Sequence, residues 1–268
     1  MVNSALSLGG LIGILLSGAF LYIEVGRYAT PQVPVSLFDE RKELVSYAAG
    51  LFAGIPLTIP WLFLLSALSN VAYVSAAVDL ALLILGSELA QWFLLRSTYF
   101  GRDAAGTFYA LGMRAGIAGI LILAFGTEYF AAGSFSAFGL LLLILTSSAL
   151  VIIEVAAGLL SMSASPLRPG VRGSPVSGGV LSAVGIVLIG FGWTSQGYLG
   201  LAAILLGIAG ASWTYFRLRD PILSRVRAAT AAPTETVPSR YGRLASSEPA
   251  EPDLALPDGT DAEPPLGK

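Results

Sequence analysis

Residues 71–95 read VAYVSAAVDLALLILGSELAQWFLL, and this stretch decides the class of fold. It is about 25 residues long, which is enough for an α-helix to cross the hydrocarbon core of a bilayer. It also contains Asp79, Glu88 and Gln91, and charged side chains at membrane depth generally face a protein interior or a water-filled cavity. The stretch therefore predicts a membrane-spanning helix whose polar side chains face other helices.

The composition of the whole chain indicates several such helices. The 268 residues are 55% hydrophobic and only 12% charged, whereas a soluble domain carries roughly 25% charged residues. The apolar residues also come in long runs, which is typical of a multi-pass membrane protein. We therefore predict an all-α fold in which residues 1–219 form a seven-helix transmembrane bundle. The predicted helices cover about residues 4–25, 44–69, 71–95, 107–125, 135–160, 176–193 and 198–216.

The last part of the chain has a different composition. Residues 220–268 are rich in Pro, Ala and acidic residues. Such a segment cannot bury enough apolar surface to offset the entropy of folding. It is predicted to be a disordered tail.

The positions of Lys and Arg predict the orientation of the bundle. They occur in the segments that follow the first, third, fifth and seventh helices, and they are absent from the N-terminus and from the segments after the second, fourth and sixth. By the positive-inside rule the N-terminus is outside the cell membrane and the tail is cytoplasmic. Aromatic residues near the helix ends agree with interfacial belts, with Tyr129, Phe130, Trp193 and Tyr198 outside and Trp92, Phe108, Tyr109, Trp213 and Tyr215 inside.

This orientation brings three charged residues to the same depth. Glu88 lies shortly before the end of the third helix. Arg114 lies about equally far after the start of the fourth helix, and Glu154 about equally far before the end of the fifth. All three lie about 12 Å from the cytoplasmic edge at ~1.5 Å per residue. Gln91 shares the face of Glu88 on its helix. We predict a cluster of these four residues, in which Arg114 pairs with one carboxylate and the other can hold a proton.

A structural role for this cluster competes with the functional one. A buried ion pair can have the structural role of fixing the register of helices and no other. Long side chains near the interface can also reach towards the headgroups. Taken alone, the cluster favours the structural interpretation. Asp79 points away from Glu88 and lies nearer the outside, with no basic residue at its depth. It is predicted to line an external vestibule or to bond a neighbouring hydroxyl.

Two further features concern helix geometry. Pro56 and Pro60 lie in the middle of the second helix, and each removes a backbone N–H and crowds the carbonyl one turn earlier. They predict a kink, which is more often a packing device than a ligand site. Two rows of glycines predict close approaches between helices. The row in the fourth helix is Gly112, Gly116 and Gly119. The row between the sixth and seventh helices is Gly185, Gly190, Gly207 and Gly210.

The residue types exclude many activities. The chain has no Cys and no His, so disulfides, thiolate chemistry and the usual zinc and haem sites are excluded. No nucleotide-binding fingerprint is present, and the loops leave no room for a soluble catalytic domain. We expect no enzyme activity, no cofactor, no metal site and no nucleic-acid partner. The expected partners are the lipid bilayer and, as a further possibility, other membrane proteins or a second copy of the chain.

Three classes of function remain open from the sequence. The first is a small-solute or ion-linked permease that uses the carboxylate–arginine cluster, Asp79 and the proline kink. The second is a structural or accessory subunit of a membrane complex that transports nothing. The third is a sensor, which is the weakest because no signalling domain follows the bundle. Buried polar groups that are dry and fully paired would favour the second class, and water-accessible ones the first.

Overall fold

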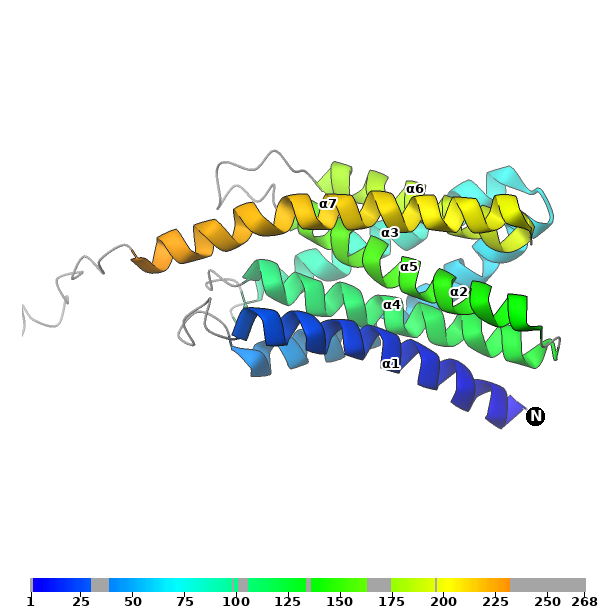
Figure 1. The fold of residues 1–268 in the computed structure, drawn as a ribbon, viewed down its shortest axis with the longest axis horizontal. Helices are drawn as coiled ribbons and strands as arrows, with labels where there is room; N and C mark the ends of the chain where they lie inside the picture. Colours follow the sequence, from blue (N-terminus) through cyan, green and yellow to red (C-terminus); the bar gives the residue numbers. More distant parts are fainter. Residues whose placement is uncertain are drawn as a thin grey trace, which may run out of the picture. The chain divides into compact units, whose positions relative to one another are not determined.

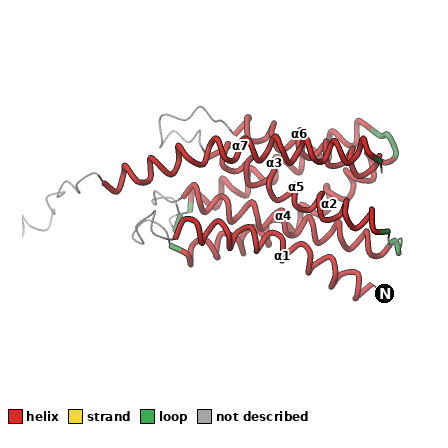
Figure 2. The backbone as a smooth tube through the Cα atoms, in the orientation of Figure 1, coloured by secondary structure: helices red, strands yellow, loops and turns green. Residues whose placement is uncertain are grey.

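The computed structural model describes residues 2–29, 39–97, 99–100, 106–133, 136–162, 175–195 and 197–231. These residues form seven α-helices and no strand (Figures 1 and 2). Each helix is long and apolar enough to span a membrane, so the prediction of an all-helical fold with seven helices of membrane-spanning length is confirmed. The helices are α1 (Val2–Ala29), α2 (Glu40–Ser69), α3 (Tyr73–Arg96), α4 (Gly106–Ala131), α5 (Ala137–Met162), α6 (Pro175–Ser195) and α7 (Tyr198–Ala231).

Two helices extend well beyond their predicted ends. α4 continues to Ala131 and stops before Gly133, whose φ of 71° is in the left-handed region that glycine adopts easily. α7 continues to Ala231, so residues 220–231 are helical and do not belong to a disordered tail. This segment, DPILSRVRAATA, ends in a stretch with three Ala and two Arg, residues that favour helix. The rest of the predicted tail, 232–268, lies outside the described residues.

The turn between α2 and α3 contains a strained residue. Val71 has a φ of 56°, which is unusual for a β-branched side chain. The turn is closed by a hydrogen bond of 2.8 Å from the Ala72 amide to the Ala67 carbonyl. α3 therefore begins at Tyr73 and not at the predicted residue 71. We call the end of the bundle that holds this turn and the start of α1 the amino-terminal end, and the opposite end the tail end (Figure 1).

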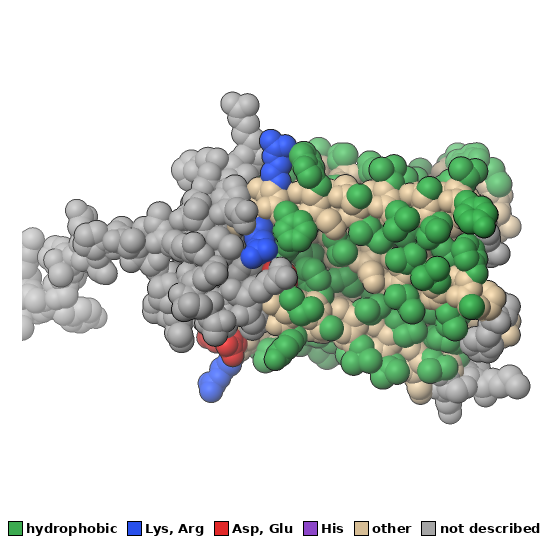
Figure 3. Space-filling view, viewed as in Figure 1, with side chains coloured by type: hydrophobic (Ala, Val, Ile, Leu, Met, Phe, Trp, Pro, Cys, Tyr) green, Lys and Arg blue, Asp and Glu red, His purple; other side chains and the backbone are tan. Residues whose placement is uncertain are grey.

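α4 and α5 form the centre of the bundle. In α4, 83% of the spanning segment is buried, and in α5 67% is, whereas α3 has only 17% of its segment buried. α4 packs against α1, α2 and α5, and α5 also packs against α6 and α7. The peripheral helices expose apolar side chains, which is the surface that lipid would cover. On the face in Figure 3, charged side chains gather at the tail end and hydrophobic side chains cover the rest.

Small residues allow α4 to lie close to two neighbours. A Cβ at Gly112 would lie 2.5 Å from Ser46 Oγ of α2, and one at Gly119 would lie 2.5 Å from Ser17 Oγ of α1. Gly116 packs against the backbone of α2 at Tyr47. The predicted close approach in α4 is thus present.

The second glycine row behaves differently. Gly185 packs against Ile153 of α5, Gly190 packs against Leu68 of α2, and a Cβ at Gly210 would meet nothing within 4 Å. The close approach of α6 and α7 instead uses Gly192 and Gly200, which touch through their backbones. Sequence spacing identified a small-residue helix pair but not the residues that make the contact.

The aromatic residues near the helix ends do not all lie in interfacial belts. Tyr198 is 90% exposed and Trp213 63% exposed, as a belt requires. Tyr129, Tyr109 and Tyr215, by contrast, are buried, and Tyr109 is fully so. The belt interpretation was therefore wrong for these residues, because an aromatic ring near a helix end can pack inwards as well as outwards.

Candidate functional site

The side chain of Arg114 is the centre of a polar cluster inside the bundle. It is fully buried, and each of its three nitrogens donates a hydrogen bond. Nε donates to Gln91 Oε1 at 2.6 Å, Nη1 to Glu154 Oε2 at 2.9 Å and Nη2 to Glu88 Oε1 at 2.6 Å. The structure therefore brings together the four residues of the predicted cluster, three selected by equal depth and Gln91 by its shared helix face.

Two serines and a backbone carbonyl extend the cluster. Ser161 Oγ donates to Glu88 Oε1 at 2.8 Å, and Ser182 Oγ donates to Glu154 Oε1 at 2.7 Å. Gln91 Nε2 donates to the carbonyl of Gly158 at 3.3 Å. The connected groups come from α3, α4, α5 and α6, so one network joins four helices.

Gly158 makes room for the guanidinium side chain. A Cβ at this position would lie 2.7 Å from Arg114 Cγ, so a larger residue would displace the arginine. Glu154, Gly158 and Ser161 follow one another at intervals of four and three residues and share one face of α5. Gly158, Ser161 and Ser182 were not predicted from the sequence, although this spacing from Glu154 could have identified the first two.

The charges in the cluster do not balance. One guanidinium is shared by two carboxylates, which gives the cluster a formal charge of −1 when both are ionised. Glu154 has 1% of its side chain exposed and Glu88 has 18%. An excess charge in such surroundings is costly, and a proton or a small cation would neutralise it. Glu88 is the more accessible of the two carboxylates.

Asp79 does not join this cluster. It is half-buried on α3, and its side chain makes no hydrogen bond or ion pair with the part of the chain that the structure describes. Pro56 and Pro60 lie within α2, which continues as one α-helix from Glu40 to Ser69. Pro56 is exposed and Pro60 half-buried, and neither belongs to the cluster.

Glu43 is a buried carboxylate that was predicted to lie before the second helix. It lies instead in the first turn of α2 and is 2% exposed. A Cβ at Gly112 would lie 2.6 Å from its Oε1, so the glycine of α4 gives this side chain its space. Its Oε2 has no hydrogen-bond partner among the described residues. Glu43 was missed because the start of the helix was predicted four residues too late.

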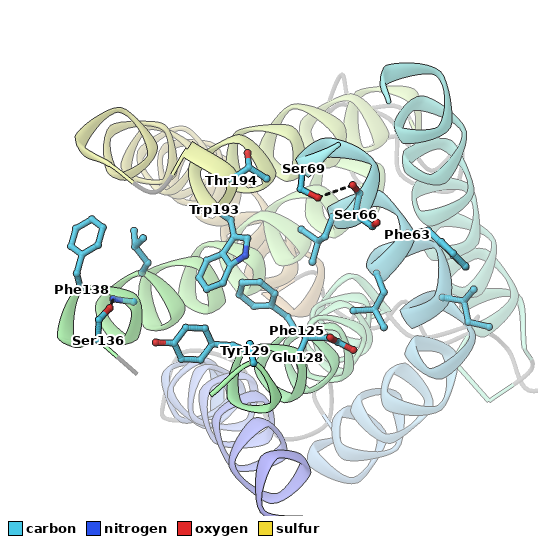
Figure 4. A pocket seen from close by; sticks show the side chains of 16 residues that line it. Phe63, Ser66, Ser69, Phe125, Glu128, Tyr129, Ser136, Phe138, Trp193 and Thr194 are labelled. Carbon is cyan, nitrogen blue, oxygen red and sulfur yellow. Dashed lines mark hydrogen bonds between the residues drawn. The ribbon is translucent and has the colours of Figure 1, made fainter. Parts of the chain in front are cut away.

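The bundle also contains a pocket at the amino-terminal end. It has a volume of about 970 Å³ and is formed by side chains of α2, α4, α5 and α6 (Figure 4). Phe125 and Tyr129 of α4 and Trp193 of α6 form its aromatic part, and Glu128 of α4 contributes a carboxylate. The pocket and the polar cluster share no residue.

Comparisons with known proteins give no family for this chain. No protein-family model matches it, and neither a curated protein sequence nor a solved structure shows significant similarity. Within the described residues, no group of three or more acidic side chains is arranged to hold a metal ion. The function has to be argued from the cluster and the pocket themselves.

Proposed function

We propose that this membrane protein is a proton- or cation-linked permease in which Glu88 and Glu154 bind the coupling ion beside Arg114. The observation that carries the proposal is the sharing of one buried guanidinium by two carboxylates. Ionisable groups at membrane depth are the usual elements of proton relays and ion pathways. Glu88 is the entry point because it is partly exposed, whereas Glu154 is enclosed.

The arrangement also supports a step that alters the helix packing. Binding of a cation at Glu88 would compete with the 2.6 Å bond from Arg114 Nη2. Because the same arginine also bonds α5 through Glu154 and α3 through Gln91, weakening one bond changes how three helices are held. Ion binding and helix movement would thereby be coupled through Arg114.

A flux assay with the full-length chain tests this proposal. The purified protein is placed in liposomes that contain a pH-sensitive dye, and gradients of Na⁺, K⁺ or Li⁺ or a membrane potential are imposed. We expect proton flux above that of protein-free liposomes, and Glu88→Gln and Glu154→Gln should each lower it by about a hundredfold, the low end of what a positioned proton-transfer group contributes. Glu40→Gln is the matched control because Glu40 is exposed at the start of α2. A wild-type flux equal to that of empty liposomes contradicts the proposal.

A second candidate is a structural or accessory subunit that transports nothing. The observation in its favour is that all three nitrogens of Arg114 are bonded and that serines bond both carboxylates. A network this complete needs no transport role to explain it, because it can hold four helices in register. In that case Glu88→Gln and Glu154→Gln would lower the melting temperature, and neither variant would change the proton flux measured for the wild type.

A further inference from the structure

The pocket at the amino-terminal end has a rigid aromatic wall. The rings of Phe125 and Trp193 lie 4.4 Å apart, and those of Tyr129 and Trp193 lie 5.6 Å apart, both in edge-to-face geometry. Trp61, which is fully buried, supports Phe125 from α2 with a ring separation of 6.4 Å. Figure 4 shows Trp193, Phe125 and Tyr129 side by side along the pocket. Interlocked rings of this kind give a preformed surface for a ligand.

The charge of the pocket has one sign. Among its lining residues Glu128 carries the only formal charge near neutral pH. It is exposed, and the described part of the chain offers its carboxylate no hydrogen bond or ion pair. The described segments that build the pocket, residues 59–69, 125–133, 136–142 and 193–194, contain no Lys or Arg. A ligand in the pocket would therefore meet an uncompensated carboxylate and no cation.

Two hydroxyl groups of the wall would meet a ligand mainly as acceptors. Ser69 Oγ donates its proton to the Ser66 carbonyl at 2.8 Å, and Thr194 Oγ1 donates to the Gly190 carbonyl at 2.9 Å. These two protons are already used within the protein, so the oxygens face the pocket mainly with their lone pairs. These two oxygens offer lone pairs to a positively charged ligand, whereas Ser136 Oγ accepts the Gly139 amide at 2.9 Å and keeps a proton to donate.

The size of the pocket selects among cations. About 970 Å³ is near the upper limit of small-molecule pockets. A hydrated inorganic ion would not use the apolar walls, which include Phe63, Leu62 and Phe138. An organic cation with apolar or aromatic substituents would use both features, since cations are attracted to ring faces as well as to carboxylates.

We infer that this pocket binds a lipophilic organic cation, held by the Glu128 carboxylate and by the ring wall of Phe125, Tyr129 and Trp193. The inference goes beyond the proposed function, because binding at this end does not require ion coupling at Arg114. It assigns a ligand class to a site that shares no residue with the polar cluster.

Equilibrium binding to the full-length protein in lipid nanodiscs tests the inference. The probes are tetraphenylphosphonium and benzyltrimethylammonium, and tetraphenylborate is the anionic match of the first in size and shape. Empty nanodiscs measure partition into lipid. We expect saturable binding of the cations only, and Glu128→Gln should weaken it by about fivefold, the scale of a partly exposed ion pair. Glu40→Gln, at the opposite end of the bundle, should leave binding unchanged.

The aromatic wall is tested separately. Trp193→Leu should weaken cation binding by about fivefold. Trp193→Phe keeps a ring, so it should weaken cation binding by less than about half as much. Melting temperatures of both variants show whether they are folded. If Trp193→Leu is not folded, Glu128→Gln still tests whether the pocket binds cations. Equal binding of tetraphenylphosphonium and tetraphenylborate would overturn the inference. So would wild-type affinity in Glu128→Gln, or the absence of saturable binding for both cations.

Discussion

The two faces of α4 are held in the bundle by different means. The face towards α1 and α2 has small residues, and Gly112, Gly116 and Gly119 let neighbouring backbones and short side chains come close. The opposite face carries Arg114, whose hydrogen bonds reach α3 and α5. In a membrane, helix association cannot rely on the hydrophobic effect, so close packing and hydrogen bonding replace it.

The difference between these faces has a consequence for function. A close backbone contact has one good geometry and little tolerance, because there is no flexible side chain that can adapt. A hydrogen-bonded charge cluster can exchange partners when a proton or cation arrives. We therefore expect the contacts of α4 with α1 and α2 to stay fixed, and any rearrangement to occur at the Arg114 face, where α4 meets α3 and α5.

Removing the charge at the centre should have the largest effect on stability. Arg114→Leu leaves the buried Glu154 and the partly exposed Glu88 without a cation, and we expect a loss of about 3–5 kcal/mol in the free energy of unfolding. Titration with sodium dodecyl sulfate measures this loss. The triple variant with Glu88→Gln and Glu154→Gln should recover most of it, since no buried charge then remains. Failure of the triple variant to recover would mean that the shape of Arg114 matters more than its charge.

The small-residue face should respond to a single methyl group. A Cβ at Gly50 of α2 would overlap the backbone carbonyl of Met113 in α4, so Gly50→Ala must push the helices apart. We expect a loss of about 1–3 kcal/mol, measured by the same titration. Gly210→Ala is the matched control, because a Cβ there meets nothing within 4 Å and alanine favours helix. Equal destabilisation by both variants would contradict the close-contact role of Gly50.

The serines of the cluster test whether its two carboxylates are equivalent. Ser182→Ala removes the bond to Glu154, which is 1% exposed, and Ser161→Ala removes the bond to Glu88, which is 18% exposed. An enclosed acceptor cannot turn to water, so Ser182→Ala should cost about 1–2 kcal/mol and Ser161→Ala less. Thermal unfolding of both variants measures the order. The reverse order would indicate that Glu88 is the more enclosed carboxylate.

These features differ in how far the sequence could predict them. The helices follow from the length and spacing of apolar runs, and the meeting of Glu88, Arg114 and Glu154 follows from equal depth. Polar residues are informative here because they are rare, so few arrangements satisfy them. The end of α7 was placed too early because a helix can continue in water once a membrane segment has nucleated it.

The pocket could not be predicted in the same way. Its wall joins aromatic residues from separate helix ends, Phe125 and Tyr129 with Trp193, and such residues are equally expected in interfacial belts. Which rings turn inwards depends on the rotation of each helix. A uniformly apolar helix has no sequence signal for its rotation, so the identity of the central helices and the place of the pocket required the structure.

The smallest effect should come from the hydroxyl group that joins α1 to α2 beside α4. Ser17 Oγ lies 2.8 Å from the Tyr47 hydroxyl and donates to the Gly13 carbonyl at 2.7 Å. Tyr47→Phe removes only the first contact, since the bond to Gly13 remains, and we expect a loss of about 0.5 kcal/mol in the free energy of unfolding. Ser17→Ala removes both contacts and should cost more. If Tyr47→Phe destabilised the protein as much as Ser182→Ala does, hydrogen bonding rather than close packing would hold this face too.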